Sequence, residues 1–73
     1  MALIALLGRN IRRHRNAQGI SQEELAFRAE MKRSYVSGIE LGKRKPSVDA
    51  LERLADALRV DPRSLLDPDR HTK

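Results

Sequence analysis

The sequence predicts a single all-α domain of five short helices, spanning residues 1–73. Apolar residues recur at intervals of three and four in several segments, which is the spacing of one face of an α-helix. Serine, aspartate, glycine and proline stand between these segments at positions typical of helix starts and stops. No segment alternates apolar and polar residues as a strand does, and there is no internal repeat or glycine-rich phosphate loop.

The chain is strongly basic, with 15 Lys plus Arg against 10 Asp plus Glu and a formal net charge of +5. This charge favours a polyanionic partner such as nucleic acid, although a merely soluble basic surface would look the same. Cysteine is absent, so neither a disulfide nor a thiolate metal site stabilises the fold. We therefore expect a protein of the reducing cytoplasm.

The first predicted helix runs from about Leu3 to Gln18, with Gly19 at its C-terminal cap. Its core stripe consists of apolar residues spaced four apart: Leu3, Leu7 and Ile11. Ile4 and Leu6 lie partly off this stripe, and we interpret them as edge-of-core or contact residues. The apolar run at the N-terminus is too short for a membrane span and lacks the basic region of a signal peptide.

The second helix begins at a predicted capping box, in which Ser21 and Glu24 each bond the other's backbone amide. Ile20 and Leu25 flank this box as a hydrophobic staple. The helix continues through small residues that allow another helix to cross closely, namely Ala26 and Ala29. A turn of about three residues should follow.

The segment from Met31 to Ser47 predicts a helix that packs with one face and binds with the other. Its packing face holds Tyr35, Val36 and Ile39, and its opposite face holds Arg33, Ser34 and Ser37. Gly42 supplies the positive φ that ends a helix, and Pro46 prevents continuation. Three cations lie between these two residues in one exposed turn: Lys43, Arg44 and Lys45.

A fourth helix is predicted after Ser47, its N-cap, with Asp49 complementing the helix dipole. Its apolar stripe is Val48, Leu51, Leu54, Ala55 and Leu58, and its outer face is Glu52, Arg53, Asp56 and Arg59. Asp61 and Pro62 then form a cap and a first-turn proline ahead of a short fifth helix ending at Leu66. Residues 67–73 look like a frayed tail.

Four motifs together resemble the Cro and phage-repressor type of helix-turn-helix domain, also called the XRE family. They are Leu25-Ala26, the YVSGIE run at 35–40, the GKRKPS run at 42–47 and the LADAL run at 54–58. The resemblance covers nearly the whole chain and implies a compact five-helix lambda-repressor-like fold. The RSYVSGIE wording at 33–40 is especially similar to the controller proteins of restriction-modification operons.

The resemblance implies that the second and third helices form the helix-turn-helix, with residues 33–41 in the DNA major groove. The implied base contacts are Arg33, Ser34, Ser37 and Arg44. The implied backbone contacts are Gln22, Lys32, Tyr35, Lys43 and Lys45. For the basic turn, the alternative is a solvated loop, and for Tyr35 it is packing against the second helix.

The resemblance also implies a structural ion pair between Arg15 and Glu40, because burying either charge alone is costly. Three positions depart from the family pattern. Glu30 stands where the family has glycine, so either a non-glycine residue has positive φ or the turn differs. Lys32 replaces a capping residue, and His14 replaces a core leucine as an edge-of-core histidine or, less simply, a pH switch.

The sequence therefore predicts a transcriptional regulator that binds an inverted-repeat operator in double-stranded DNA as a homodimer. Its expected interface is the C-terminal part of the fourth helix and the fifth helix, through Val60, Leu65 and Leu66. The N-terminal Ile4 and Leu6 form the rival surface. The alternative function is an antitoxin that binds a toxin and represses its own operon. An enzyme is disfavoured because no catalytic motif accompanies the two histidines, and we expect no cofactor, metal, membrane or small-molecule substrate.

Overall fold

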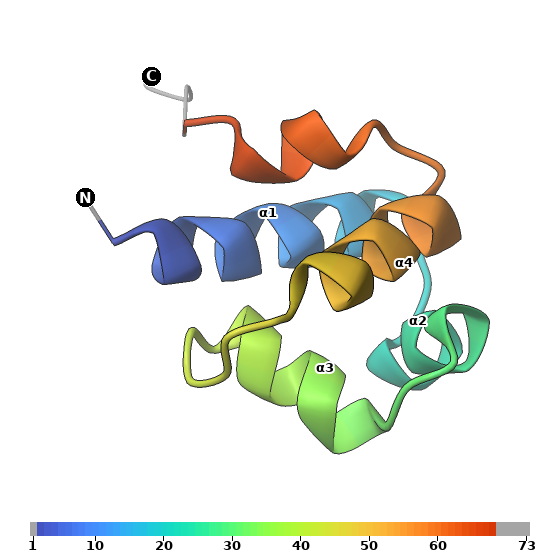
Figure 1. The fold of residues 1–73 in the computed structure, drawn as a ribbon. Coiled ribbons are helices and arrows are strands. Elements are labelled where there is room, and N and C mark those ends of the chain that lie inside the picture. Colours follow the sequence, from blue (N-terminus) through green and yellow to red (C-terminus); the bar gives the residue numbers. More distant parts are fainter. Residues whose placement is uncertain (1, 69–73) are drawn as a thin grey trace.

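The computed structural model describes residues 2–68, and these form four α-helices followed by a short 3-10 helix (Figure 1). The elements are α1 (Leu3–Ala17), α2 (Gln22–Ala29), α3 (Arg33–Glu40), α4 (Val48–Leu58) and the 3-10 helix η1 (Pro62–Leu66). No strand occurs in this part of the chain. The all-α prediction is confirmed, and residues 69–73 of the expected tail lie outside the described residues.

The predicted fifth α-helix is instead the 3-10 helix η1. The Ser64 amide donates to the Asp61 carbonyl at 2.8 Å. This hydrogen bond joins residues three positions apart, which is the spacing of a 3-10 helix. Only five residues separate Asp61 from Asp67, the two caps. The segment is therefore too short to establish the four-residue bonding of an α-helix.

Side-chain caps begin α2 and α4 as the sequence predicts. The Ser21 hydroxyl accepts from the Glu24 amide at 3.0 Å, and the Ser47 hydroxyl accepts from the Ala50 amide at the same distance. The reciprocal half of the capping box is wrong, because the Glu24 carboxylate accepts from Arg28 Nε at 2.9 Å instead. The α2 start therefore depends on the serine.

The core forms where α1, α2, α3, α4 and η1 meet. Its buried apolar side chains are Leu7, Ile11, Leu25, Ala26, Ala29, Val36, Ile39, Leu54, Ala55, Leu58 and Leu65. Two predicted core residues are exposed, Leu3 at 50% and Val48 at 84%, whereas Leu6 is buried. η1 lies along α1 in Figure 1 while α3 packs against the same helix, so the buried arc of α1 is wider than one stripe.

A buried asparagine joins the two ends of the domain. Asn10 is fully buried, and its Nδ2 donates to the Leu65 carbonyl at 2.9 Å and the Asp67 carbonyl at 2.8 Å. Asp67 is thus held against α1 and does not belong to a frayed tail. Leu65, which we expected on the dimer surface, is fully buried in the core, so it offers no surface to a partner.

An arginine of α4 secures the turn between α2 and α3. Glu30 has φ 57°, so a non-glycine residue does occupy the left-handed region. Arg53 Nε donates to the Ala29 carbonyl at 3.1 Å, and its Nη2 donates to the Glu30 carbonyl. Arg53, which we expected on the outer face, therefore satisfies carbonyls that the end of α2 leaves unpaired.

Candidate nucleic-acid interface

One side of α3 is buried and the other is open. Val36 and Ile39 are in the core, whereas Arg33 and Ser34 are exposed and Ser37 is half-buried. The side chains on the open side are short or cationic and bear hydrogen-bond donors. In Figure 1, α3 lies at the edge of the molecule with the 41–47 segment beside it. The helix is therefore accessible along the face that the sequence assigned to DNA.

α1 holds the end of α3 by a close approach at Gly8. A Cβ added to Gly8 would lie 2.4 Å from the Ile39 carbonyl oxygen and 2.8 Å from that of Glu40. Real Cβ atoms do not come so close, so only glycine allows this crossing. No periodicity of the sequence indicated this contact, because glycine adds nothing to an apolar pattern.

Arg15 and Glu40 form the predicted ion pair. Arg15 Nε lies 2.7 Å from Glu40 Oε2, and Arg15 Nη2 lies 3.0 Å from Oε1. The hydrogen bonds to Glu40 raise the pKa of Arg15 above its ordinary value. The Glu40 side chain is only 2% exposed, so the carboxylate depends on these donors.

Gln22 is the second donor to the same carboxylate. Its Nε2 donates to Glu40 Oε1 at 3.0 Å, and Arg15 Nη1 donates to the Ile20 carbonyl at 2.9 Å. The start of α2, where Gln22 was expected to meet a phosphate, is thereby joined to the end of α3. The phosphate contact of Gln22 remains a prediction.

Arg44 folds back over α3 from the basic turn. Its guanidinium carbon lies 5.2 Å from the centre of the Tyr35 ring, within the range of a cation-π contact. A Cβ on Gly38 would lie 2.3 Å from Arg44 Cγ, so the missing side chain of Gly38 makes room for the arginine. The amides of Lys43 and Arg44 donate to the Gly38 carbonyl at 2.8 and 3.1 Å. Arg44 thus lies on the surface of α3.

The other cations near α3 remain exposed. Lys43 and Lys45 extend from the turn, and Lys32 is the N-cap of α3 without a capping side-chain bond. Gly42 has φ 74°, as its place after α3 predicted. Positive charge therefore lies before and after a helix whose open face carries hydrogen-bond donors, which suits a sugar-phosphate backbone on either side of a groove.

His14 belongs to no metal-binding group within residues 2–68. His14 is half-buried at the edge of the packing, and its Nε2 is buried without a partner. Among residues 2–68, no group of three or more histidine or acidic side chains could hold a metal ion. No helix in this range is long and apolar enough to cross a membrane.

The family model described as Helix-turn-helix matches residues 11–65, which include α2, the turn and α3. The chain belongs to the helix-turn-helix family. The α2–turn–α3 unit is the helix-turn-helix itself, and the open side of α3 is the face of its second helix. Of the predicted site residues, Lys32, Arg33 and Ser34 are consecutive at the start of this helix. Arg44 comes from the turn and lies against Tyr35 and Gly38 of the same helix.

Similar proteins include several restriction-modification controllers. The chain is 43% identical over 63 residues to Control protein C.BamHI of Bacillus amyloliquefaciens, covering 85% of this chain and 78% of that one. The controller protein C.AhdI of Aeromonas hydrophila has a similar structure, with a TM-score of 0.86 and 43% identity over 89% of this chain and 98% of that one. C.Esp1396I bound to a 19 base pair DNA duplex aligns with a TM-score of 0.80 and 30% identity, over 86% and 84% of the two chains. All three relatives are named as control or controller proteins.

Proposed function

We propose that this helix-turn-helix protein is a sequence-specific regulator of transcription that controls a restriction-modification operon. The observation that carries the proposal is the exposed start of α3, where Arg33 and Ser34 are presented by a helix fixed to α1 through the Arg15–Glu40 pair. A rigid helix with hydrogen-bonding residues on its open side is suited to reading base edges. The 43% identity to controller proteins supports the choice of operon.

Each site residue then has a defined role on the DNA. Arg33 donates two parallel bonds to guanine O6 and N7, and Ser34 and Ser37 bond base edges. Arg44, supported on the Tyr35 ring, reaches a further base. The phosphate contacts come from Gln22, Lys32, Tyr35, Lys43 and Lys45, which position the protein without reading sequence.

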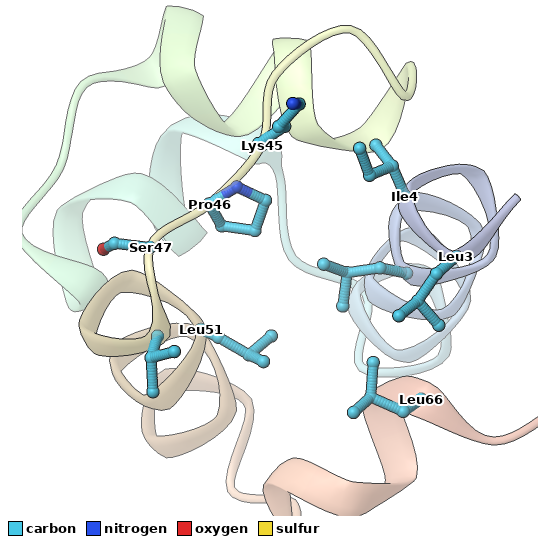
Figure 2. Close-up of a pocket in the computed structure, with 9 residues that line it drawn as sticks. Leu3, Ile4, Lys45, Pro46, Ser47, Leu51 and Leu66 are labelled. Atoms are coloured by element: carbon cyan, nitrogen blue, oxygen red, sulfur yellow. The ribbon is translucent and has the colours of Figure 1, made fainter.

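We further propose that the protein binds an inverted-repeat operator as a two-fold homodimer. One eight-residue reading helix contacts few base edges, whereas two such helices about 34 Å apart reach successive major grooves. An apolar groove of about 240 Å³ lies between α1, the start of α4 and η1 (Figure 2). It is bordered by the exposed side chains of Leu3, Val48 and Leu66.

The groove lies at the start of α4, whereas the sequence pointed to the C-terminal part of that helix. In Figure 2, Leu51 of α4 points across the space toward Leu3 of α1 and Leu66 of η1. A second copy that covers the groove would bury apolar surface for a domain with an undersized core. We therefore place the dimer contact here, with Leu66 retained from the expected set and Leu65 removed.

Selection of bound sites from a random DNA pool tests this function. We expect an inverted-repeat consensus whose half-sites are separated by about one helical turn, 10–10.5 base pairs. Enrichment of no sequence would overturn the specific-regulator proposal, and a consensus without two-fold symmetry would overturn the dimer. Purification of the native complex provides a second test, because a stable one-to-one complex with a toxin protein would favour an antitoxin instead.

A further inference from the structure

Five large apolar side chains are substantially exposed in the described chain: Leu3, Phe27, Leu41, Val48 and Leu66. Three of these border the apolar groove, and Phe27 lies on α2. Leu41 is the remaining one, 61% exposed at the C-cap of α3. Its side chain belongs neither to the core nor to the groove, so its exposure has no structural explanation within one copy of the protein.

Leu41 continues the open face of α3. Its backbone keeps right-handed helical angles, φ −85° and ψ −2°, and its amide donates to the Ser37 carbonyl at 3.0 Å. Residues four and seven apart lie on the same face of a helix. Leu41 therefore lies one turn beyond Ser37 and two turns beyond Ser34, at about 10 Å from Ser34 along the axis.

The end of α3 that carries Leu41 is held firmly. Gly8 of α1 packs against the carbonyls of Ile39 and Glu40, the two residues before Leu41. A Cβ on Gly42, the residue after it, would be 3.6 Å from the Ala5 Cα atom. The close approach of Gly8 therefore fixes the residues before Leu41, and the leucine is presented to solvent at an end of α3 that is held against α1.

We propose that Leu41 is a specificity determinant that packs on the 5-methyl group of a thymine in each half-site. Leucine cannot bond a phosphate or the polar edge of a base, and the thymine methyl is the apolar group that the major groove presents. The DNA major groove admits an α-helix, and Leu41 lies on the same face of α3 as Ser34 and Ser37, so this face can present polar and apolar contacts to one half-site. This inference rests on the proposed function and adds apolar readout to its polar contacts.

The first experiment repeats site selection with Leu41→Ala and with Phe27→Ala as a matched control. Phe27 is also an exposed apolar residue, but it lies on α2 and outside the proposed DNA surface. We expect the parent and the control to select thymine at one position of each half-site, and Leu41→Ala to lose that preference alone. An identical consensus from all three proteins would overturn the inference and leave the proposed function intact.

The second experiment removes only the methyl group, by replacing each thymine of the selected site in turn with deoxyuridine. At the thymine that Leu41 contacts, deoxyuridine should weaken binding by the parent about fourfold per half-site. This factor corresponds to the burial of one methyl-sized group. Leu41→Ala should not respond there. If every substitution affected the parent and Leu41→Ala equally, Leu41 would have no methyl contact. If the parent selected no site at all, the regulator proposal itself would fail first.

Discussion

Arg15 and Glu40 lie 25 positions apart and form a two-bond ion pair, with Nε to Oε2 at 2.7 Å and Nη2 to Oε1 at 3.0 Å. Gln22 donates to the same carboxylate at 3.0 Å. The pair therefore joins the end of α1, the start of α2 and the end of α3. Because the two charged groups share two parallel bonds, their relative orientation is fixed as well as their distance.

Glu40→Ala should destabilise the fold by roughly 3–5 kcal/mol, because it leaves the Arg15 guanidinium without its partner in a largely buried position. The free energy of unfolding from urea titration measures this effect. Glu24→Ala is the control, since it breaks the exposed pair with Arg28 and should cost no more than about 0.5 kcal/mol. Equal stabilities for Glu40→Ala and the parent would show that the pair contributes nothing.

Arg33→Ala should reduce discrimination at one base pair of each half-site, at a cost on the order of 1–3 kcal/mol. Lys43→Ala should weaken binding to all sequences about equally, because a phosphate contact carries no sequence information. Titration of the selected operator and of scrambled DNA with each variant separates the two effects. If Arg33→Ala and the parent had the same ratio of affinity for the selected operator to affinity for scrambled DNA, the placement of α3 in the DNA major groove would be contradicted.

Lys32→Ser should stabilise the free protein by about 1 kcal/mol while weakening its binding to DNA. Lysine cannot accept a bond from the first-turn amides of α3 and opposes the helix dipole, whereas serine caps the helix. Loss of one phosphate contact should make the slope of the logarithm of the binding constant against the logarithm of the salt concentration shallower by about one. Thermal melting and operator titration at several salt concentrations measure both. Lys43→Ser is the control, which should lose affinity without gaining stability.

Glu30→Gly should stabilise the domain by roughly 0.5–1 kcal/mol. A side chain at φ 57° carries a steric cost of about 1–2 kcal/mol that glycine avoids, partly offset by the greater freedom of glycine in the unfolded chain. Glu52→Gly, in the interior of α4, should cost about 1 kcal/mol instead. Chemical denaturation should therefore show a higher free energy of unfolding for Glu30→Gly and a lower one for Glu52→Gly. A lower free energy of unfolding in both variants would mean that Glu30 is not strained.

The local features of the fold could be predicted from the sequence. The α2 cap at Ser21, the α4 cap at Ser47 and the helix stop at Gly42 depend on neighbouring residues only, and all three are present. The Arg15–Glu40 pair was also predicted, although it came from the family resemblance and not from the spacing of charges. Neighbouring residues were therefore sufficient to predict the caps and the helix stop, and the family resemblance was sufficient to predict the ion pair.

Contacts between distant segments could not be predicted in the same way. Asn10 donates to the Leu65 carbonyl across 55 positions, and Gly8 packs against backbone atoms of α3. Neither residue adds to a periodic pattern of apolar residues, so the sequence pattern does not indicate these contacts. The short segment Pro62–Leu66 was equally ambiguous, because five residues contain too few turns to define which side is buried. In the structure, Leu65 enters the core, whereas Leu66 is 39% exposed.

Leu66→Asp should separate the proposed dimer into monomers. Leu66 is 39% exposed and borders the groove that a second copy would cover. A carboxylate placed in that contact would lose its water without gaining a partner. Since 1.4 kcal/mol corresponds to a tenfold change in affinity, we expect operator binding to weaken by about tenfold or more, with a steeper dependence on protein concentration.

Analytical ultracentrifugation of Leu66→Asp and Val48→Asp tests the position of the contact, since both side chains border the groove but neither is in the core. Phe27→Asp places the same charge on an exposed apolar site of α2 and should leave the dimer intact. Leu65→Asp would not be informative, because a charge in the core would unfold the domain. A parent protein that is monomeric at tens of micromolar, and still monomeric on its operator, would reject the two-fold arrangement. A dimer that survives both groove substitutions would place the interface elsewhere, with the half-buried Val60 as the remaining residue of the expected set.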